Sequence, residues 1–148
     1  MEIIIYTTQM ILFRKIVETC IYSSELETMK NFYVNSIGLE FVSEESGRHV
    51  FLKAGRSMLL IFNPVSTTSK SGTIFPTHGA STPPAILHFA LEIEKEDYKD
   101  LKDTLIRNGI KIEKELTWGN DTLKSLYFRD PAGNLVEYIT KGNWPIED

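Results

Sequence analysis

The sequence has one cysteine, three histidines and no cluster of basic residues. Cys20 has no second thiol in the chain, so an intramolecular disulfide is excluded and a reducing, cytoplasmic location is expected. The 148 residues carry 16 Lys and Arg against 20 Asp and Glu, which gives a formal net charge of −4 at pH 7. Without a basic patch, the chain lacks the electrostatic footprint of a nucleic-acid-binding protein.

A long hydrophobic run is also missing. The most apolar segment, residues 2–13, is interrupted by Thr7, Thr8 and Gln9 and is too short to span a bilayer. It also lacks the basic start and the small-residue cleavage site of a signal peptide. We therefore expect no membrane partner. Residues 1–14 are interpreted as an N-terminal extension, with an extra edge strand or a loose tail over residues 3–6 and an alternative start at Met10.

What the chain does contain is an ordinary globular composition, with 42% hydrophobic and 24% charged residues, and a regular series of elements. Alternating apolar residues predict strands, and apolar residues at helical spacing predict helices. The first series is a strand at 14–23, a helix at 26–36 and strands at 40–42, 49–54 and 57–63. The second is a strand at 85–93, a helix at 95–108 and strands at 110–116, 123–129 and 135–139.

The two series repeat one plan, βαβββ. From Glu18 to Gly38 is 20 positions and from His88 to Gly109 is 21, and each interval holds a strand, an amphipathic helix and a terminating glycine. The duplication predicts an α+β fold of two paired βαβββ modules whose mixed sheets form a cleft. Within one domain, the predicted parts are residues 15–65 (first module), 66–84 (a connector rich in Ser, Thr, Pro and Gly), 85–141 (second module) and 142–148 (a tail).

A carboxylate in the last strand needs an explanation. Residues 130–134, DPAGN, form a turn, and the strand that follows is apolar except at Glu137. Alternation places Glu137 on the same face as Leu135 and Ile139. A carboxylate there needs a metal, a cation or a substrate proton to offset its desolvation, and we interpret it as a metal ligand. The alternative is a strand-end Glu that faces water.

Glu18 and His88 are candidate partners for Glu137, because they occupy the same position in the two copies. Two carboxylates and an imidazole on rigid strands suit Mn²⁺, Fe²⁺, Co²⁺, Ni²⁺ or Zn²⁺. Three protein ligands leave room for water or substrate, and Glu18 or Glu137 is a candidate catalytic proton shuttle. The alternatives are a core histidine at position 88 and a surface ion pair between Glu18 and Arg14 or Lys15.

Several of these residues carry a resemblance to a known family. They are the segment 128–137 (FRDPAGNLVE), the helix end Asn31-Phe32-Tyr33…Ile37-Gly38-Leu39, and the paired strands at Glu18 and His88. Over roughly residues 15 to 141 the chain resembles the vicinal oxygen chelate superfamily, which includes glyoxalase I, bleomycin-resistance and fosfomycin-resistance proteins and extradiol dioxygenases. The resemblance implies a paired βαβββ fold, a divalent metal held by the sheets, a homodimer, and a small-molecule substrate that binds the metal through two neighbouring oxygens.

Position by position, the match to the family is incomplete. His88 and Glu137 match two usual ligand positions, whereas Glu18 stands where many members have His or Gln. The strand at 58–62 has no carboxylate, although glyoxalase I enzymes generally place one there. The missing carboxylate counts against a true glyoxalase I. A pattern of three ligands is closer to the fosfomycin-resistance and dioxygenase branches, but these commonly have two His and one Glu rather than one His and two Glu.

Two functions from different classes follow. The first is a metal-dependent enzyme, a lyase, isomerase, transferase or dioxygenase, and the retained Glu, His and Glu favour it. The second is a metal-free protein of the bleomycin-resistance type that sequesters a small molecule, and the lack of a second histidine favours it.

Further residues are candidates to contact a substrate. Aromatic residues are expected to wall a cavity, and cationic or imidazole groups to bind an anion or polarise an oxygen. The candidates are Arg48, His49, Tyr22, Phe51, His78 and Tyr127. The alternatives are a surface strand end for Arg48 and His49, a solvated loop for His78, and core packing for the three aromatic residues. Cys20 is interpreted as packing rather than as a nucleophile.

Overall fold

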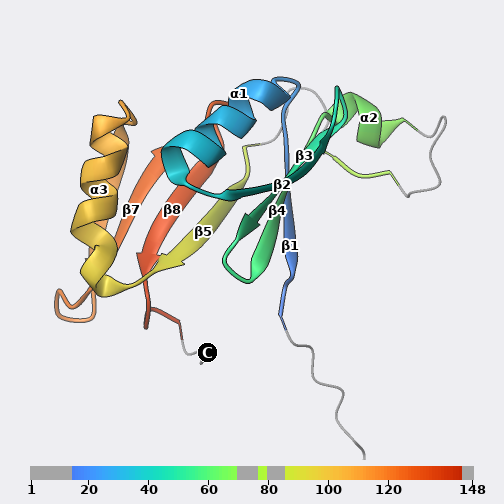
Figure 1. The fold of residues 1–148 in the computed structure, drawn as a ribbon. Coiled ribbons are helices and arrows are strands. Elements are labelled where there is room, and N and C mark those ends of the chain that lie inside the picture. The colour runs from blue at the N-terminus through green and yellow to red at the C-terminus, as the bar shows by residue number, and fades with distance from the viewer. Residues whose placement is uncertain (1–14, 70–76, 80–85, 145–148) are drawn as a thin grey trace, which may run out of the picture.

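A computed structural model of the chain describes residues 15–69, 77–79 and 86–144, without the side chain of Trp118. The strand considered for residues 3–6 lies outside these ranges. Two four-stranded mixed sheets lie side by side, and the first helix lies against both of them (Figure 1). In the part of the chain that is described, no helix is both long and apolar enough to cross a membrane.

The first sheet has the strand order β1-β4-β3-β2 and the second the order β5-β8-β7-β6, so each module has the same topology. The first module consists of β1 (Glu18–Tyr22), α1 (Leu26–Asn31) with a π-helical continuation (Phe32–Ile37), β2 (Glu40–Glu45), β3 (His49–Ala54) and β4 (Ser57–Phe62). After α2 (Pro64–Thr68), the second consists of β5 (His88–Ile93), a 3₁₀ turn (Lys95–Asp97), α3 (Tyr98–Arg107), β6 (Ile112–Trp118), β7 (Leu123–Arg129) and β8 (Leu135–Thr140).

The helix α2 includes residues 66–68, the start of the predicted connector. Asn63 caps it: its side-chain oxygen accepts a hydrogen bond from the amide of Val65 at 3.1 Å. Pro64 stands at the first helical position, where its missing N–H costs nothing. A five-residue helix is too short to show apolar periodicity, so only the Asn-Pro pair signals it in the sequence.

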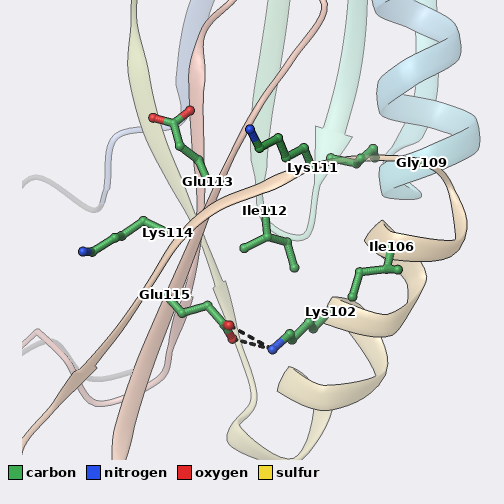
Figure 2. Close-up of a pocket in the computed structure, with 9 residues that line it drawn as sticks. Lys102, Ile106, Gly109, Lys111, Ile112, Glu113, Lys114 and Glu115 are labelled. Atoms are coloured by element: carbon green, nitrogen blue, oxygen red, sulfur yellow. Dashed lines mark hydrogen bonds and ion pairs between the residues drawn. The ribbon is translucent and has the colours of Figure 1, made fainter.

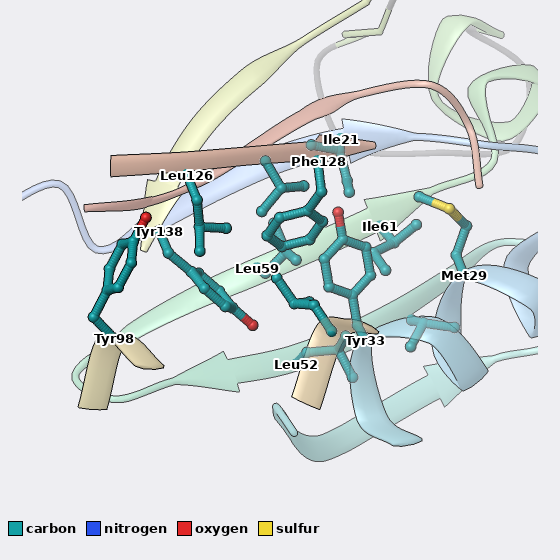
Figure 3. Packing of buried hydrophobic residues seen from close by; sticks show 13 residues of the cluster. Ile21, Met29, Tyr33, Leu52, Leu59, Ile61, Tyr98, Leu126, Phe128 and Tyr138 are labelled. Atoms are coloured by element: carbon teal, nitrogen blue, oxygen red, sulfur yellow. The ribbon is translucent and has the colours of Figure 1, made fainter. Parts of the chain in front are cut away.

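One hydrophobic core joins the two modules. Met29 and Tyr33 of the first helix are fully buried between one face of the first sheet and one face of the second (Figure 3). The buried residues are Ile21, Val50, Leu52, Leu59 and Ile61 from the first sheet and Leu126, Phe128, Val136 and Tyr138 from the second. Since side chains alternate along a strand, the opposite face of each sheet lies outside this core. We call these the outer faces.

A buried hydrogen bond ties the first helix to the DPAGN turn. The hydroxyl of Tyr33 donates to Asp130 Oδ2 at 2.8 Å, and both residues are buried. Burial, followed by the charge of Asp130 and the bond to it, raises the pKa of Tyr33, so the phenol keeps its proton and remains a donor. The bond fixes the turn, and therefore the start of β8, against the first module.

Removing this hydroxyl with Tyr33→Phe is expected to lower the free energy of unfolding by about 2 kcal/mol, because a buried carboxylate loses one of its donors. Urea denaturation at a fixed protein concentration measures the change. Tyr98→Phe is the matched control: Tyr98 donates to Glu115 at 2.8 Å, but Glu115 is exposed and keeps Lys102 as a second partner. We expect the control to cost less than half as much; equal losses would contradict a special role for the buried bond.

Candidate metal and substrate site

The DPAGN turn sets the position of β8 beside β5. Asp130 Oδ1 accepts hydrogen bonds from the amides of Ala132 and Asn134 at 2.9 Å, and Gly133 supplies a positive φ of 86°. Asn134 Oδ1 then accepts from the amide of Leu87 at 3.0 Å, one residue before β5 begins. The turn therefore carries the side chain that holds the two strands in register.

This register brings His88 and Glu137 together on the outer face of the second sheet. His88 pairs with Leu135 and Ala90 with Glu137 in the parallel ladder. His88 Nδ1 lies 3.1 Å from the carbonyl oxygen of Leu135, and a carbonyl only accepts, so Nδ1 carries the proton in this contact. Nε2 of a neutral ring is then unprotonated, and it lies 3.4 Å from Glu137 Oε2.

Glu137 is a buried carboxylate, with 6% of its surface exposed. Tyr127, its neighbour on β7, hydrogen bonds to it. Burial and then this bond raise the pKa of Tyr127, so the phenol stays protonated and acts as the donor. Within the described ranges no Lys or Arg pairs with Glu137. Two acceptors, Nε2 and the carboxylate, thus face one another and need a shared proton or a metal cation between them. The donor set fits a divalent metal.

Glu18 is not part of this pair. It lies exposed on the outer face of the first sheet, and no group of three His, Cys, Asp or Glu side chains suited to a metal forms within the described part of one chain. The three predicted ligands therefore do not meet inside a single copy. Of the cations considered as surface partners, Lys15 instead donates to the carbonyl of Arg56, and Arg14 lies outside the residues described.

The duplicated register identifies the position of the absent fourth carboxylate. In the first sheet Glu18 pairs with Met58 and Cys20 with Leu60. The corresponding pairs in the second sheet are His88 with Leu135 and Ala90 with Glu137. Leu60 therefore stands at the position of Glu137, and it is apolar.

Of the six predicted substrate-binding residues, four lie close together on the outer face of the first sheet. Tyr22, His49, Phe51 and His78 gather around the ring of Phe62. Phe62 is missing from the predicted substrate contacts, because an all-apolar strand predicts burial on both faces, and Leu59 to Phe62 are indeed buried. Tyr127 lies on the second sheet beside Glu137. Arg48 makes an ion pair with Glu45 at 3.5 Å and so has a structural partner.

Comparison with known proteins agrees with this fold. The sequence profile of the Glyoxalase/Bleomycin resistance protein/Dioxygenase superfamily matches residues 15–138. The chain belongs to this superfamily. Members commonly use divalent metals, bind small molecules and often form dimers. A comparison with curated proteins gave no match.

Solved structures of the superfamily align over nearly the whole chain. The lactoylglutathione lyase from Agrobacterium tumefaciens is 34% identical, with a TM-score of 0.81, over 89% of this chain and 97% of that one. A glyoxalase family protein from Bacillus anthracis is 20% identical, with a TM-score of 0.63, over 88% and 98% of the chains, and supports the fold alone.

A surface hollow of about 590 Å³ lies between α3 and β6 (Figure 2), and neither His88 nor Glu137 is among the residues that line it. Its carboxylates are already paired: Glu115 with Lys102 at 2.8 Å and Glu113 with Arg129 at 2.8 Å. Both carboxylates of this hollow therefore already have cationic partners, and the outer faces remain the candidate site of this superfamily member.

Proposed function

We propose that the protein is a divalent-metal-dependent enzyme that acts on a small molecule through two neighbouring oxygens, and that two copies share each metal site. His88 and Glu137 of one copy and Glu18 of another would hold the ion. The observation that carries the proposal is the buried Glu137 carboxylate. It lies 3.4 Å from an imidazole nitrogen, and no Lys or Arg among the described residues forms an ion pair with it.

A second copy is needed because the ligands lie on different sheets. Both sheets use their inner faces for the common core, and no three such side chains come together in the described part of one chain, which favours a site completed by another copy. A two-fold dimer that places the first outer face of one copy against the second outer face of the other creates two equivalent sites. Ile16 and Ile86, each two residues before a ligand, are 83% and 69% exposed, and such an interface would cover them.

The metal, when bound, would act as a Lewis acid that polarises the substrate oxygens. Tyr127 would hold the Glu137 carboxylate in place, and the Leu135 carbonyl would hold the His88 ring with Nε2 free. Glu18 is exposed in one copy, so among the three it is best placed to carry a proton to or from the substrate.

The likeness to a lactoylglutathione lyase favours a lyase reaction. Leu60 at the fourth position favours a centre with three protein ligands rather than four, so an isomerase, transferase or dioxygenase reaction stays an alternative. The free Cys20 thiol is consistent with a cytoplasmic enzyme.

Titration of metal-free protein with Mn²⁺, Ni²⁺ and Zn²⁺ tests the proposal. We expect about one ion per chain by calorimetry, bound to a dimer in sedimentation velocity. At a metal concentration of about 100 times Kd, the melting temperature should rise by roughly 5 to 10 °C. A protein that binds none of these ions contradicts the metal-dependent function, and a monomer that binds one ion contradicts the shared site.

The metal-free binding protein is the second candidate, and the ring cluster around Phe62 is the observation that favours it. Stabilisation by aromatic or cationic small molecules in the presence of a chelator, together with no stabilisation by metals, would support it instead.

A further inference from the structure

Five rings form one continuous cluster on the outer face of the first sheet. Phe62 is its centre, with ring centroids 4.9 Å from His78, 5.5 Å from Phe51, 5.8 Å from His49 and 6.5 Å from Tyr22. His49 lies flat on Phe51, at 4.0 Å and an interplanar angle of 13°. We call these residues the ring cluster.

The strand register arranges this outer face in three rows. The first row crosses β1, β4 and β3 as Tyr22, Phe62 and His49. The second row is Cys20, Leu60 and Phe51. The third row is Glu18, Met58 and Lys53. The predicted metal ligand and the ring cluster are therefore at opposite ends of one strand face.

The rows define the distance between the predicted metal ligand and the ring cluster. Glu18 and Tyr22 are four residues apart on β1, and a strand rises about 3.3 Å per residue, so their Cα atoms are about 13 Å apart. Between them the side chains of Cys20 and Leu60 are apolar or weakly polar. A charged group held over this middle row would lose its hydration without gaining a partner. The face thus suits a molecule with two distinct ends and an apolar middle.

His49 adds a polar edge to a neutral ring surface. Its Nδ1 is buried and has no hydrogen-bond partner in the described chain; Glu45 Oε2 is 3.9 Å away, too far for a bond. Burial, partly opposed by Glu45 and reinforced by Arg48, lowers the pKa of His49, so the ring is uncharged near neutral pH. A neutral ring surface offers stacking contacts to a flat unsaturated group and no opposite charge to an anion.

We propose that the substrate is elongated, with two neighbouring oxygens at the end near Glu18 and a flat unsaturated ring seated on the ring cluster, up to about 13 Å away along the strand. This deepens the proposed function and rests on it. The ring cluster supplies stacking surface on the first row, Leu60 and Cys20 supply an apolar middle, and the metal end supplies the chelated oxygens. A saturated group of the same size fills the space but loses the stacking contacts.

Three 2-oxo acids with the same chelating end test this by calorimetry on manganese-loaded protein: 2-oxohexanoate, 6-cyclohexyl-2-oxohexanoate and 6-phenyl-2-oxohexanoate. We expect the phenyl compound to bind roughly 3- to 10-fold more tightly than the cyclohexyl one, and about 10-fold or more tightly than the acid without a ring. Benzoylformate, whose ring lies next to the chelating oxygens, should gain nothing over 2-oxohexanoate. Equal affinities for the phenyl and cyclohexyl compounds would overturn the proposal. The same result is expected, and the proposal is equally wrong, if a second copy covers the ring cluster.

Tyr22→Leu should reduce the advantage of the phenyl compound to less than about threefold. Phe41→Leu is the control: Phe41 is 42% exposed and pairs with the buried Leu52, so it points away from the outer face, and its loss should leave the advantage unchanged. If Tyr22→Leu does not fold, His49→Leu replaces it. The metal titration separates the two proposals, because a protein that binds no metal contradicts the proposed function, whereas one that binds metal but shows no ring preference contradicts only the substrate class.

Discussion

Replacing Glu137 by Gln is expected to weaken Mn²⁺ or Ni²⁺ binding by about 100-fold or more and to leave the protein folded. The metal would lose a charged ligand, since an amide oxygen is a much poorer donor to a divalent cation. The fold should survive because Gln has the same shape and its carbonyl still accepts the hydrogen bond from Tyr127. Calorimetry gives the affinity, and the melting temperature of the metal-free protein gives the stability.

The expected stability of metal-free Glu137→Gln is informative in itself. In the metal-free protein, Glu137 is a buried charge with a neutral donor and a half-exposed histidine as partners. Removing that charge should leave the melting temperature unchanged or higher, in contrast to the usual cost of a substitution in a strand. A large fall would indicate that Glu137 holds the fold together rather than a metal.

Two control variants show whether the loss of metal affinity is specific to Glu137. Tyr127→Phe removes the donor to Glu137, together with the hydrogen bond between Tyr127 and Ser125, and should cost roughly tenfold in metal affinity, as expected for a residue that orients a ligand. Glu92→Gln makes the same chemical change on the same strand face as His88, at an exposed position. It should leave the affinity unchanged. Equal losses in Glu137→Gln and Glu92→Gln would mean that the net charge of the face, rather than a specific ligand, attracts the ion.

Most of the fold follows from local sequence signals. β3 and β7 have the predicted bounds, because a turn on each side limits them. The helix end at Gly38 follows from its φ of 91°, which favours glycine. The π-helical segment before it could not be predicted, because the apolar residues Met29, Phe32 and Tyr33 have the spacing of an ordinary α-helix and nothing in the sequence signals the longer i→i+5 bonds.

The pairing of His88 with Glu137 could also be predicted in outline, from alternation and the repeated plan. The relative orientation of the two outer faces could not be predicted from the sequence. Alternation assigns Glu18 and His88 to the faces opposite Ile21 and Phe89, but it says nothing of how the sheets are arranged in space. That arrangement depends on contacts between residues far apart in the chain, such as Tyr33 with Asp130. The separation of Glu18 from the other two predicted ligands is a property of this packing.

If two copies share each site, variants that are inactive alone should restore one another. Glu18→Ala and His88→Ala should each bind metal poorly as homodimers. In a mixed dimer, one site combines the intact Glu18 of one chain with the intact His88 and Glu137 of the other, while the second site lacks two ligands. Random reassociation of equal amounts makes about half of the dimers mixed, each with one intact site of two, so binding should recover to about a quarter of the wild-type capacity.

A mixture of His88→Ala and Glu137→Ala is the matched control, because both residues belong to the same half of each site. Every site in that mixture lacks a ligand, whichever chains associate, so no recovery is expected. Calorimetry after unfolding and refolding the mixed chains measures the capacity, and refolded wild-type protein sets the full value. Recovery in the first mixture alone can arise only from a site built by two chains. Failure of both mixtures, with wild-type protein still binding metal, would place all the ligands in one chain and require a different partner for His88 and Glu137.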